Sequence, residues 1–375
     1  MKLTFHNTYR WYMAGAAMLC IAFFNQSCSK LGDVFHHFEH KNELKNFNQV
    51  NLVSNNDEYH AAHVDPHLLD AWGLTFSSGG IAWISSNGGH VSNVYDKDGN
   101  MLAARPEVAI PSDTGATGGM PTGTVVNSDP NTADFVLSNG TAGRFFFVGQ
   151  DGVLSGWNPA AGNFALKIKT TEKAGYTGLT MAQNSAGEYH LYAANFTSGK
   201  IEVWDKGFNA VNLPFTDPGL PSGYAPFNIQ AVGGSLYVMY AKVGPTGDEE
   251  HGVGLGYVDV YNANGILQNR FASTGKLNAP WGVAWAPDSF FTDDDGNPTP
   301  AILVGNFGDG YINVFDLKGK SMGQLRGPEG KPMQIQGLWS LMFPPATATT
   351  VDPNRLYFTA GPNDEMDGLF GYITK

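Results

Sequence analysis

The clearest pattern in the chain is a series of short apolar segments separated by Gly, Asn and Asp turns. Residues 278–319 show it best. Short runs rich in β-branched and aromatic residues, bounded by turn residues, predict strands. This stretch therefore predicts one small four-stranded sheet, with strands at 281–285, 302–304, 311–315 and 322–325.

The same unit recurs along the chain. Its first strand is marked by a small or turn-forming residue that returns every 50 to 55 positions, at Gly73, Gly123, Gly178, Asn228, Gly282 and Gly337. The third strand of each unit ends in an aromatic residue, namely Tyr95, Trp157, Trp204, Tyr261, Phe315 and Tyr372. An all-strand repeat of this length is typical of a β-propeller. We predict an all-β, six-bladed β-propeller with four-stranded antiparallel blades.

The two ends of the chain predict how the ring closes. The last repeat has room for strands near 338–343, 356–359 and 369–373, and the chain then stops at Lys375. A spare strand, NQVNLV, lies at 48–53. A three-stranded last blade would expose an edge that invites wrong pairing. We therefore expect the N-terminal strand to complete the last blade.

Composition and charge narrow the picture further. The chain has 47 glycines and only 15% charged residues, whereas soluble domains average about 25%. Long amphipathic helices need charged faces, so we expect very little helix. The net charge of −12, with no Lys/Arg-rich run after the N-terminus, argues against nucleic acid and anionic membrane surfaces as partners. We expect a monomer.

The N-terminus predicts export. Lys2 and Arg10 precede an apolar run at 11–24, which has the length of a signal-peptide core. Cys28 follows directly and resembles the lipidated residue of a bacterial lipoprotein; an ordinary secretory signal with an unpaired thiol is the alternative. The predicted organisation is a signal peptide at 1–27, a polar tether at 28–47 and a single propeller at 48–375. We expect a lipid-anchored protein of the bacterial cell envelope, or otherwise a periplasmic or secreted one, with membrane contact only through the anchor.

Several motifs resemble a known family. They are APWGVAWAP with LVGNFGDGYINVFD, then PFNIQAVGGSLYVMYAK and LYFTAGPNDEMDGLFGYI. These segments are similar to an uncharacterised family of exported bacterial proteins related to NHL-repeat β-propellers. The resemblance covers about 51–373 and implies fold and export, but no reaction.

Candidate functional residues follow from the predicted ring. In propellers, the loop that enters the innermost strand and the loop between the second and third strands open on one face, where ligands usually bind. An alternative for the repeated Asn residues is a turn-forming role, whereas Asp364 and Glu365 break the repeat pattern. The candidate ligand-binding residues at the channel mouth are Trp72, Tyr176, Phe227, Asn228, Lys242, Trp281, Asp364 and Glu365.

Two functions remain open at this point. The first is a non-catalytic scaffold that binds a protein or carbohydrate ligand at the channel mouth, because no acid, base or nucleophile set stands out in the sequence. The second is a calcium-assisted lactonase or lyase, by analogy with other six-bladed propellers. Calcium prefers oxygen ligands, and the residues predicted to supply them are Asn195, Asn228, Asn306 and Glu365.

Overall fold

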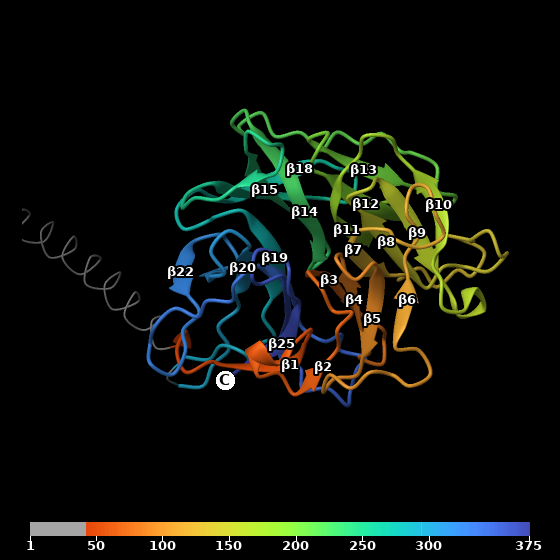
Figure 1. The fold of residues 1–375 in the computed structure, drawn as a ribbon. Coiled ribbons are helices and arrows are strands. Elements are labelled where there is room, and N and C mark those ends of the chain that lie inside the picture. The colour runs from red at the N-terminus through yellow and green to blue at the C-terminus, as the bar shows by residue number, and fades with distance from the viewer. Residues whose placement is uncertain (1–42, 294) are drawn as a thin grey trace, which may run out of the picture.

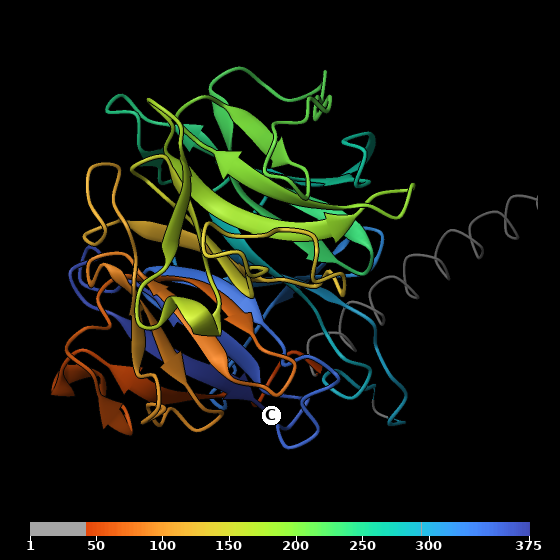
Figure 2. The same cartoon turned by 90° about the vertical axis from the view of Figure 1, so that its right-hand side faces the viewer.

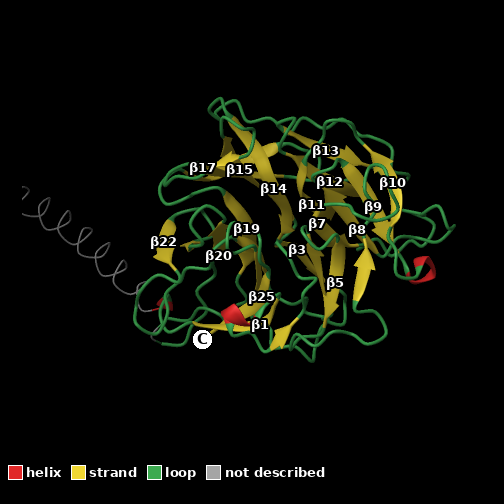
Figure 3. Cartoon of the chain, in the orientation of Figure 1, coloured by secondary structure: helices red, strands yellow, loops and turns green. Residues whose placement is uncertain are grey.

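Six small antiparallel sheets surround a common axis, as the predicted propeller requires (Figure 1). The computed structural model describes residues 43–293 and 295–375. Within 48–293 and 295–375, helix is limited to two 3₁₀ turns, η1 (Asp57–Tyr59) and η2 (Pro159–Ala161) (Figure 3). The all-β, six-bladed prediction is confirmed.

The first three blades use consecutive strands, with the innermost strand first. Blade 1 contains β3 (Ala71–Phe76), β4 (Ala82–Ser86), β5 (Val91–Tyr95) and β6 (Glu107–Ala109). Blade 2 contains β7 (Pro121–Val126), β8 (Phe145–Gly149), β9 (Val153–Trp157) and β10 (Leu166–Thr170). Blade 3 has three regular strands, and its fourth is reduced to a bridge between Trp204 and Ala210; the three are β11 (Tyr176–Gln183), β12 (Tyr189–Asn195) and β13 (Lys200–Trp204).

Blades 4 and 5 continue the order. Blade 4 contains β14 (Tyr224–Val232), β15 (Ser235–Val243), β17 (Gly256–Tyr261) and β18 (Leu267–Ser273). An insertion after β15 folds back on it as β16 (Glu249–Glu250). Blade 5 contains β19 (Pro280–Trp285), β20 (Ile302–Asn306), β21 (Ile312–Phe315) and β22 (Ser321–Gln324).

Blade 6 joins both ends of the described chain. Its strands are β23 (Leu338–Met342), β24 (Leu356–Ala360) and β25 (Leu369–Thr374), followed by β1 (Asn48–Ser54) and the short β2 (His63–Val64). β1 pairs antiparallel with β25 from Asn48↔Thr374 to Ser54↔Leu369. In two views at right angles, the red-orange N-terminal strand lies against the blue C-terminal ones (Figures 1 and 2). The prediction that the N-terminal strand closes the ring is confirmed.

The innermost strands pack backbone to backbone around the axis. A Cβ atom on Gly73 would lie 2.4 Å from the Thr122 carbonyl oxygen, and one on Gly282 would lie 2.6 Å from that of Trp339. Each innermost strand also has an irregularity in its pairing at this position, as between Leu338 and Leu341 in blade 6. We call the residue at this close approach in each innermost strand the ring position. In blade 6 the register places Ser340 there, so the predicted Gly337 was wrong by three residues.

Several predictions fall outside the described residues. These are the signal peptide at 1–27, the lipidated Cys28 and nearly all of the 28–47 tether, and they stay predictions. In residues 43–293 and 295–375, no helix has the length and apolar character that crossing a membrane would require.

The closing strand provides a test of the fold. Val53 is fully buried and pairs with Phe370, whereas Gln49 in the same strand is exposed. We expect Val53→Asp to lower the free energy of unfolding by about 3–5 kcal/mol, because it buries an uncompensated charge at the seam. The control Gln49→Asp should stay within about 0.5 kcal/mol. Urea unfolding would measure both, and equal effects would contradict a seam closed by β1.

Candidate functional site

Aromatic rings fill the axis of the propeller. The pairing irregularity in each innermost strand is a β-bulge, and the residue just before the ring position lies within it. Four of these six residues are aromatic. Trp72 of blade 1 contacts Trp281 of blade 5 at a centroid distance of 6.4 Å, so the two side chains meet across the axis. Trp339 stacks on Trp72 at 3.5 Å, and Phe227 lies 5.7 Å from Trp339. We call the buried cluster around these rings the axial plug; its aromatic members are Trp72, Phe196, Phe227, Trp281, Phe307 and Trp339.

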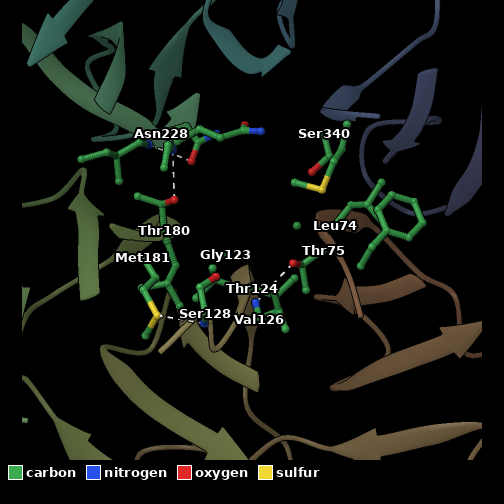
Figure 4. Close-up of a pocket in the computed structure, with 18 of the residues that line it drawn as sticks. Leu74, Thr75, Gly123, Thr124, Val126, Ser128, Thr180, Met181, Asn228 and Ser340 are labelled. Atoms are coloured by element: carbon green, nitrogen blue, oxygen red, sulfur yellow. Dashed lines mark hydrogen bonds between the residues drawn. The ribbon is translucent and has the colours of Figure 1, made fainter. Parts of the chain in front are cut away.

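The plug contributes to the walls of two cavities. The lower cavity has a volume of about 270 Å³ and is enclosed mainly by the innermost strands (Figure 4). Figure 4 shows Thr75, Thr180, Asn228 and Ser340 arranged around it from four different blades. Trp281 of the plug also lines it. The hydroxyls of Thr75 and Thr180 accept hydrogen bonds from the backbone N–H groups of neighbouring blades, at 3.2 and 3.0 Å, and therefore act within the scaffold.

The upper cavity lies on the loop face, where the sequence predicted the site. Its volume is about 430 Å³, and Phe307 of the plug is part of its lining. The loops come from blades 4, 5 and 6. The described residues that line the cavity include no Lys or Arg, and its polar lining consists of Glu249, His251, Asp309, Gln334, Gln336, Asp364 and Glu365.

Asp70 is buried beneath this cavity. Its carboxylate accepts hydrogen bonds from the indole N–H groups of Trp72, at 2.5 Å, and Trp339, at 3.0 Å. A Cβ on Gly361, which lines the cavity, would lie 2.3 Å from Asp70 Oδ1. Burial raises the pKa of Asp70 to about 8, the negative charge of Glu365 adds to this effect, and the two indole donors oppose it. Asp70 thus links the plug to the acidic cavity above it.

Glu365 is the most perturbed carboxylate of the cavity lining. Its side chain is accessible, but the surrounding protein limits its hydration, and this raises its pKa to about 7. Repulsion from Glu249, Asp248 and Asp364 contributes further, and His251 partly opposes it. The Glu365 carboxylate has no hydrogen-bond partner among residues 43–293 and 295–375. The cavity therefore holds more negative charge than its own residues neutralise.

His251 and Glu249 stand together on the blade 4 insertion. The His251 Nε2 atom lies 3.3 Å from a Glu249 carboxylate oxygen, and the imidazole packs edge-on against Phe307. The hydrogen bond to Glu249 raises the pKa of His251, and the charges of Glu249, Glu365 and Asp309 act in the same direction, against the effect of burial. The insertion thus brings an acid–imidazole pair to the cavity wall.

The loop that carries Glu365 is conformationally strained. We call residues 361–368, between β24 and β25, the strap. Three consecutive strap residues have left-handed backbone conformations, Asn363 (φ 57°), Asp364 (φ 50°) and Glu365 (φ 65°). This conformation costs roughly 1–2 kcal/mol for most residues with a Cβ atom but less for Asn and Asp, so the strain centres on Glu365. Such strain persists only where the surroundings enforce it, and it concentrates at functional sites.

The structure brings some of the predicted binding residues together. Trp72, Phe227 and Trp281 meet in the plug, and Asp364 and Glu365 line the upper cavity. Tyr176 does not join them. Its ring packs against Trp204 of the same blade, and its hydroxyl lies 2.6 Å from Glu202. Lys242 forms an ion pair with Glu250 at 2.7 Å and is absent from the cavity lining.

The four residues predicted as calcium ligands lie in different surroundings. Glu365 lines the upper cavity and Asn228 the lower one, where the Asn228 amide donates to the Trp281 carbonyl at 2.9 Å. The Asn195 amide donates to Glu202 at 2.8 Å, and the Asn306 amide donates to the Lys276 carbonyl at 2.8 Å. In the described part of the chain, no three His, Cys, Asp or Glu side chains are grouped as a metal site requires.

Sequence reasoning missed several residues of the site. Trp339 is fully buried at the centre of the plug, and Phe307 stacks on it at 3.8 Å. Asp70 could have been suspected from its position beside Trp72 in a segment that enters an innermost strand. Glu249 and His251 lie in an insertion that breaks the repeat, and an irregularity of that kind was the available signal.

Comparison with known proteins gives close relatives of no assigned function. No protein-family model matches the chain. Two uncharacterized proteins of Acanthamoeba polyphaga mimivirus are each 32% identical to it, over 338 and 345 residues. Each alignment covers 87% of this chain, and 80% and 86% of the relatives. The chain belongs to their family. Because these relatives are viral, the bacterial and exported character implied by the sequence resemblance stays a prediction.

Similar solved structures are more distant. Virginiamycin B lyase from Staphylococcus aureus has a TM-score of 0.49 at 11% identity, covering 88% of this chain and 99% of that one. A calcium-binding protein, regucalcin, from Agrobacterium tumefaciens has a TM-score of 0.46 at 15% identity, covering 81% and 90%. Structural similarity at this level does not indicate the function of this chain.

The strained strap predicts an unusual order of stabilities. Glu365→Gly and Glu365→Ala both remove the carboxylate, but only glycine relieves the left-handed strain. After allowing for the greater freedom of glycine in the unfolded chain, we expect Glu365→Gly to be more stable than Glu365→Ala by about 0.5–1 kcal/mol. Guanidinium unfolding at one pH would measure the difference. The reverse order would show that the strap is not strained at this residue.

The raised pKa of Glu365 predicts how stability varies with pH. The folded state binds this proton more tightly than the unfolded chain, so its contribution to stability is complete below pH 4.5 and is lost as the pH rises through about 7. We expect Glu365→Gln to match the wild type in melting temperature near pH 4.5 and to exceed it near pH 8. Parallel melting curves across this range would mean that the Glu365 pKa is not raised.

Proposed function

We propose that this propeller is a non-catalytic binding module whose upper cavity takes a basic side chain of a protein partner. The main observation in support is the cavity of about 430 Å³, which is lined by carboxylate and amide groups and one imidazole. A guanidinium or ammonium group would supply the positive charge that the lining lacks. It would also relieve the repulsion that raises the pKa of Glu365.

The burial of the plug favours a protein ligand over a carbohydrate. Sugar rings commonly bind against an open aromatic face, whereas Phe307 is 7% exposed and already stacks on Trp339. The other aromatic members of the plug are also buried. The acidic lining then offers hydrogen-bond acceptors without an aromatic platform. Electrostatic complementarity of this kind contributes both specificity and association rate.

Calcium-assisted lactonase or lyase chemistry is less well supported by the arrangement of side chains. Asn228 and Glu365, two of the four expected ligands, line different cavities. The Oδ1 atom of Asn195, which would be the calcium ligand, already accepts hydrogen bonds from the backbone N–H groups of Gly175 and Ser198, at 3.3 and 3.1 Å. Export to the cell envelope is a separate proposal that rests on the N-terminal sequence alone.

Short peptides test the proposal directly. A blocked pentapeptide with a central arginine should bind, and its citrulline analogue, which has nearly the same shape but no charge, should not. Glu365→Gln should weaken arginine-peptide binding at least about tenfold at pH 8, because it removes one partner of a charge pair. Binding should also tighten from pH 6 to pH 8, because Glu365 ionises and His251, whose pKa is raised, loses its proton as the pH rises. Isothermal titration calorimetry would measure all three effects.

Matched controls define the contrary outcomes. Glu188→Gln changes an exposed carboxylate in the β11–β12 turn, away from the cavity lining, and should leave binding unchanged. Equal binding of the arginine and citrulline peptides would refute charge recognition. Binding of neutral oligosaccharides alone would establish the carbohydrate function instead. A calcium titration that saturates, and is abolished by Glu365→Gln, would favour the metal-dependent alternative.

A further inference from the structure

The strap is fastened to the N-terminal segment through one buried carboxylate. Asp367 is 7% exposed, and its Oδ1 atom accepts hydrogen bonds from the side-chain amides of Asn55, at 2.7 Å, and Asn56, at 3.0 Å. Its Oδ2 atom accepts from the Tyr59 hydroxyl at 2.7 Å and from the Asn363 amide at 3.1 Å. Three of the four donors thus belong to the segment that follows the closing strand β1, and the fourth belongs to the strap itself.

Backbone hydrogen bonds extend this connection in two directions. Asn55 and Gly368 are joined twice, since the Asn55 N–H donates to the Gly368 carbonyl and the Gly368 N–H donates to the Asn55 side chain. The Asp367 carbonyl accepts from the Asp70 N–H at 3.1 Å, and the Asp367 N–H donates back to the Pro362 carbonyl at 3.1 Å. The same residue therefore contacts the N-terminal segment, both ends of the strap and the acid beneath the cavity.

We propose that Asp367 and Tyr59 are positioning residues that hold the strap in its left-handed conformation and so present Glu365 to the upper cavity. This inference rests on the proposed binding function. Neither residue lines the cavity, so both act through the strap. The strained conformation needs external support, and the described contacts of the strap place much of that support on residues 55–59. Closure of the ring and formation of the site then depend on the same segment.

The ionisation of Asp367 agrees with this role. Burial alone would raise the pKa of Asp367, but hydrogen bonds from Asn55, Tyr59, Asn363 and Asn56 lower it below its usual value. The carboxylate consequently stays charged at any pH where Glu365 titrates. Charged acceptors form stronger hydrogen bonds than neutral ones. We call Asp367 and its four donors the clamp; its hydrogen bonds persist while the charge of the cavity varies.

A conservative pair of variants tests the clamp. Tyr59→Phe removes the hydroxyl that binds Asp367, whereas Tyr192→Phe removes a 2.7 Å bond from a buried tyrosine of blade 3 to the Ala263 carbonyl in blade 4. We expect Tyr59→Phe to speed amide hydrogen exchange in residues 361–368 about tenfold and to weaken arginine-peptide binding about fivefold, because a hydrogen bond to a charged group is lost. Tyr192→Phe should lower the melting temperature to a similar extent and leave both other quantities within about twofold, because it lies between blades 3 and 4, away from the strap.

The two readouts separate this inference from the proposed function. If the wild-type protein binds no arginine peptide, the proposed function fails, and the exchange data alone decide whether the strap is clamped. If the peptide binds but Tyr59→Phe changes neither exchange nor affinity, the clamp is refuted. Asp367→Asn provides a second variant, and we expect larger changes in the same directions because it removes the charge that all four donors share. Equal responses of Tyr59→Phe and Tyr192→Phe would show that the effect is general destabilisation and would also refute the clamp.

Discussion

Direct contact between the backbones of neighbouring innermost strands is the constraint on which this propeller depends. Four ring positions are glycines because no Cβ fits; one on Gly123 would lie 2.3 Å from the Leu179 nitrogen. The other two ring positions carry side chains that make the contact themselves. Asn228 donates to the Trp281 carbonyl, and Ser340 donates to the Trp72 carbonyl. The six blades are therefore joined at the axis by steric fit in four positions and by hydrogen bonds in two.

This close packing also determines what can lie on the axis. The bulge beside each ring position turns one more side chain toward the axis. Four of these side chains are large and aromatic, and they fill the space that would otherwise form a central channel. Trp72 and Trp339 then supply both hydrogen-bond donors of Asp70. A buried carboxyl group needs such partners. The chemistry of the upper cavity consequently begins in the packing of the axis, and changes to the plug are expected to alter the electrostatics of the loop face.

The sequence predicted the fold well because the residues that pack the blades together recur in every repeat. The spacing of glycines and terminal aromatic residues located all six blades, and a missing strand at one end of the chain matched a spare strand at the other. It predicted the site only in part. Alternation along a strand cannot reveal a bulge. Tyr176 was therefore chosen, although Thr177 is the residue within the bulge of blade 3. Ser340 was missed at the ring position of blade 6 for the same reason. Glu249 and His251 come from an insertion whose path no repeat defines. Asp364 and Glu365 were chosen because they depart from the pattern, and both line the upper cavity.

The upper cavity combines features that each oppose stability. Glu365 is strained at the end of three consecutive left-handed residues, and the carboxylates around it repel one another with no Lys or Arg among the described lining residues. A fold under selection for stability alone would replace Glu365 by glycine or by a neutral residue. The chain instead holds the strap in place with four donors to Asp367. Stabilisation at a buried position thus offsets strain at an accessible one, which is the arrangement expected where a loop must keep its shape before its ligand arrives.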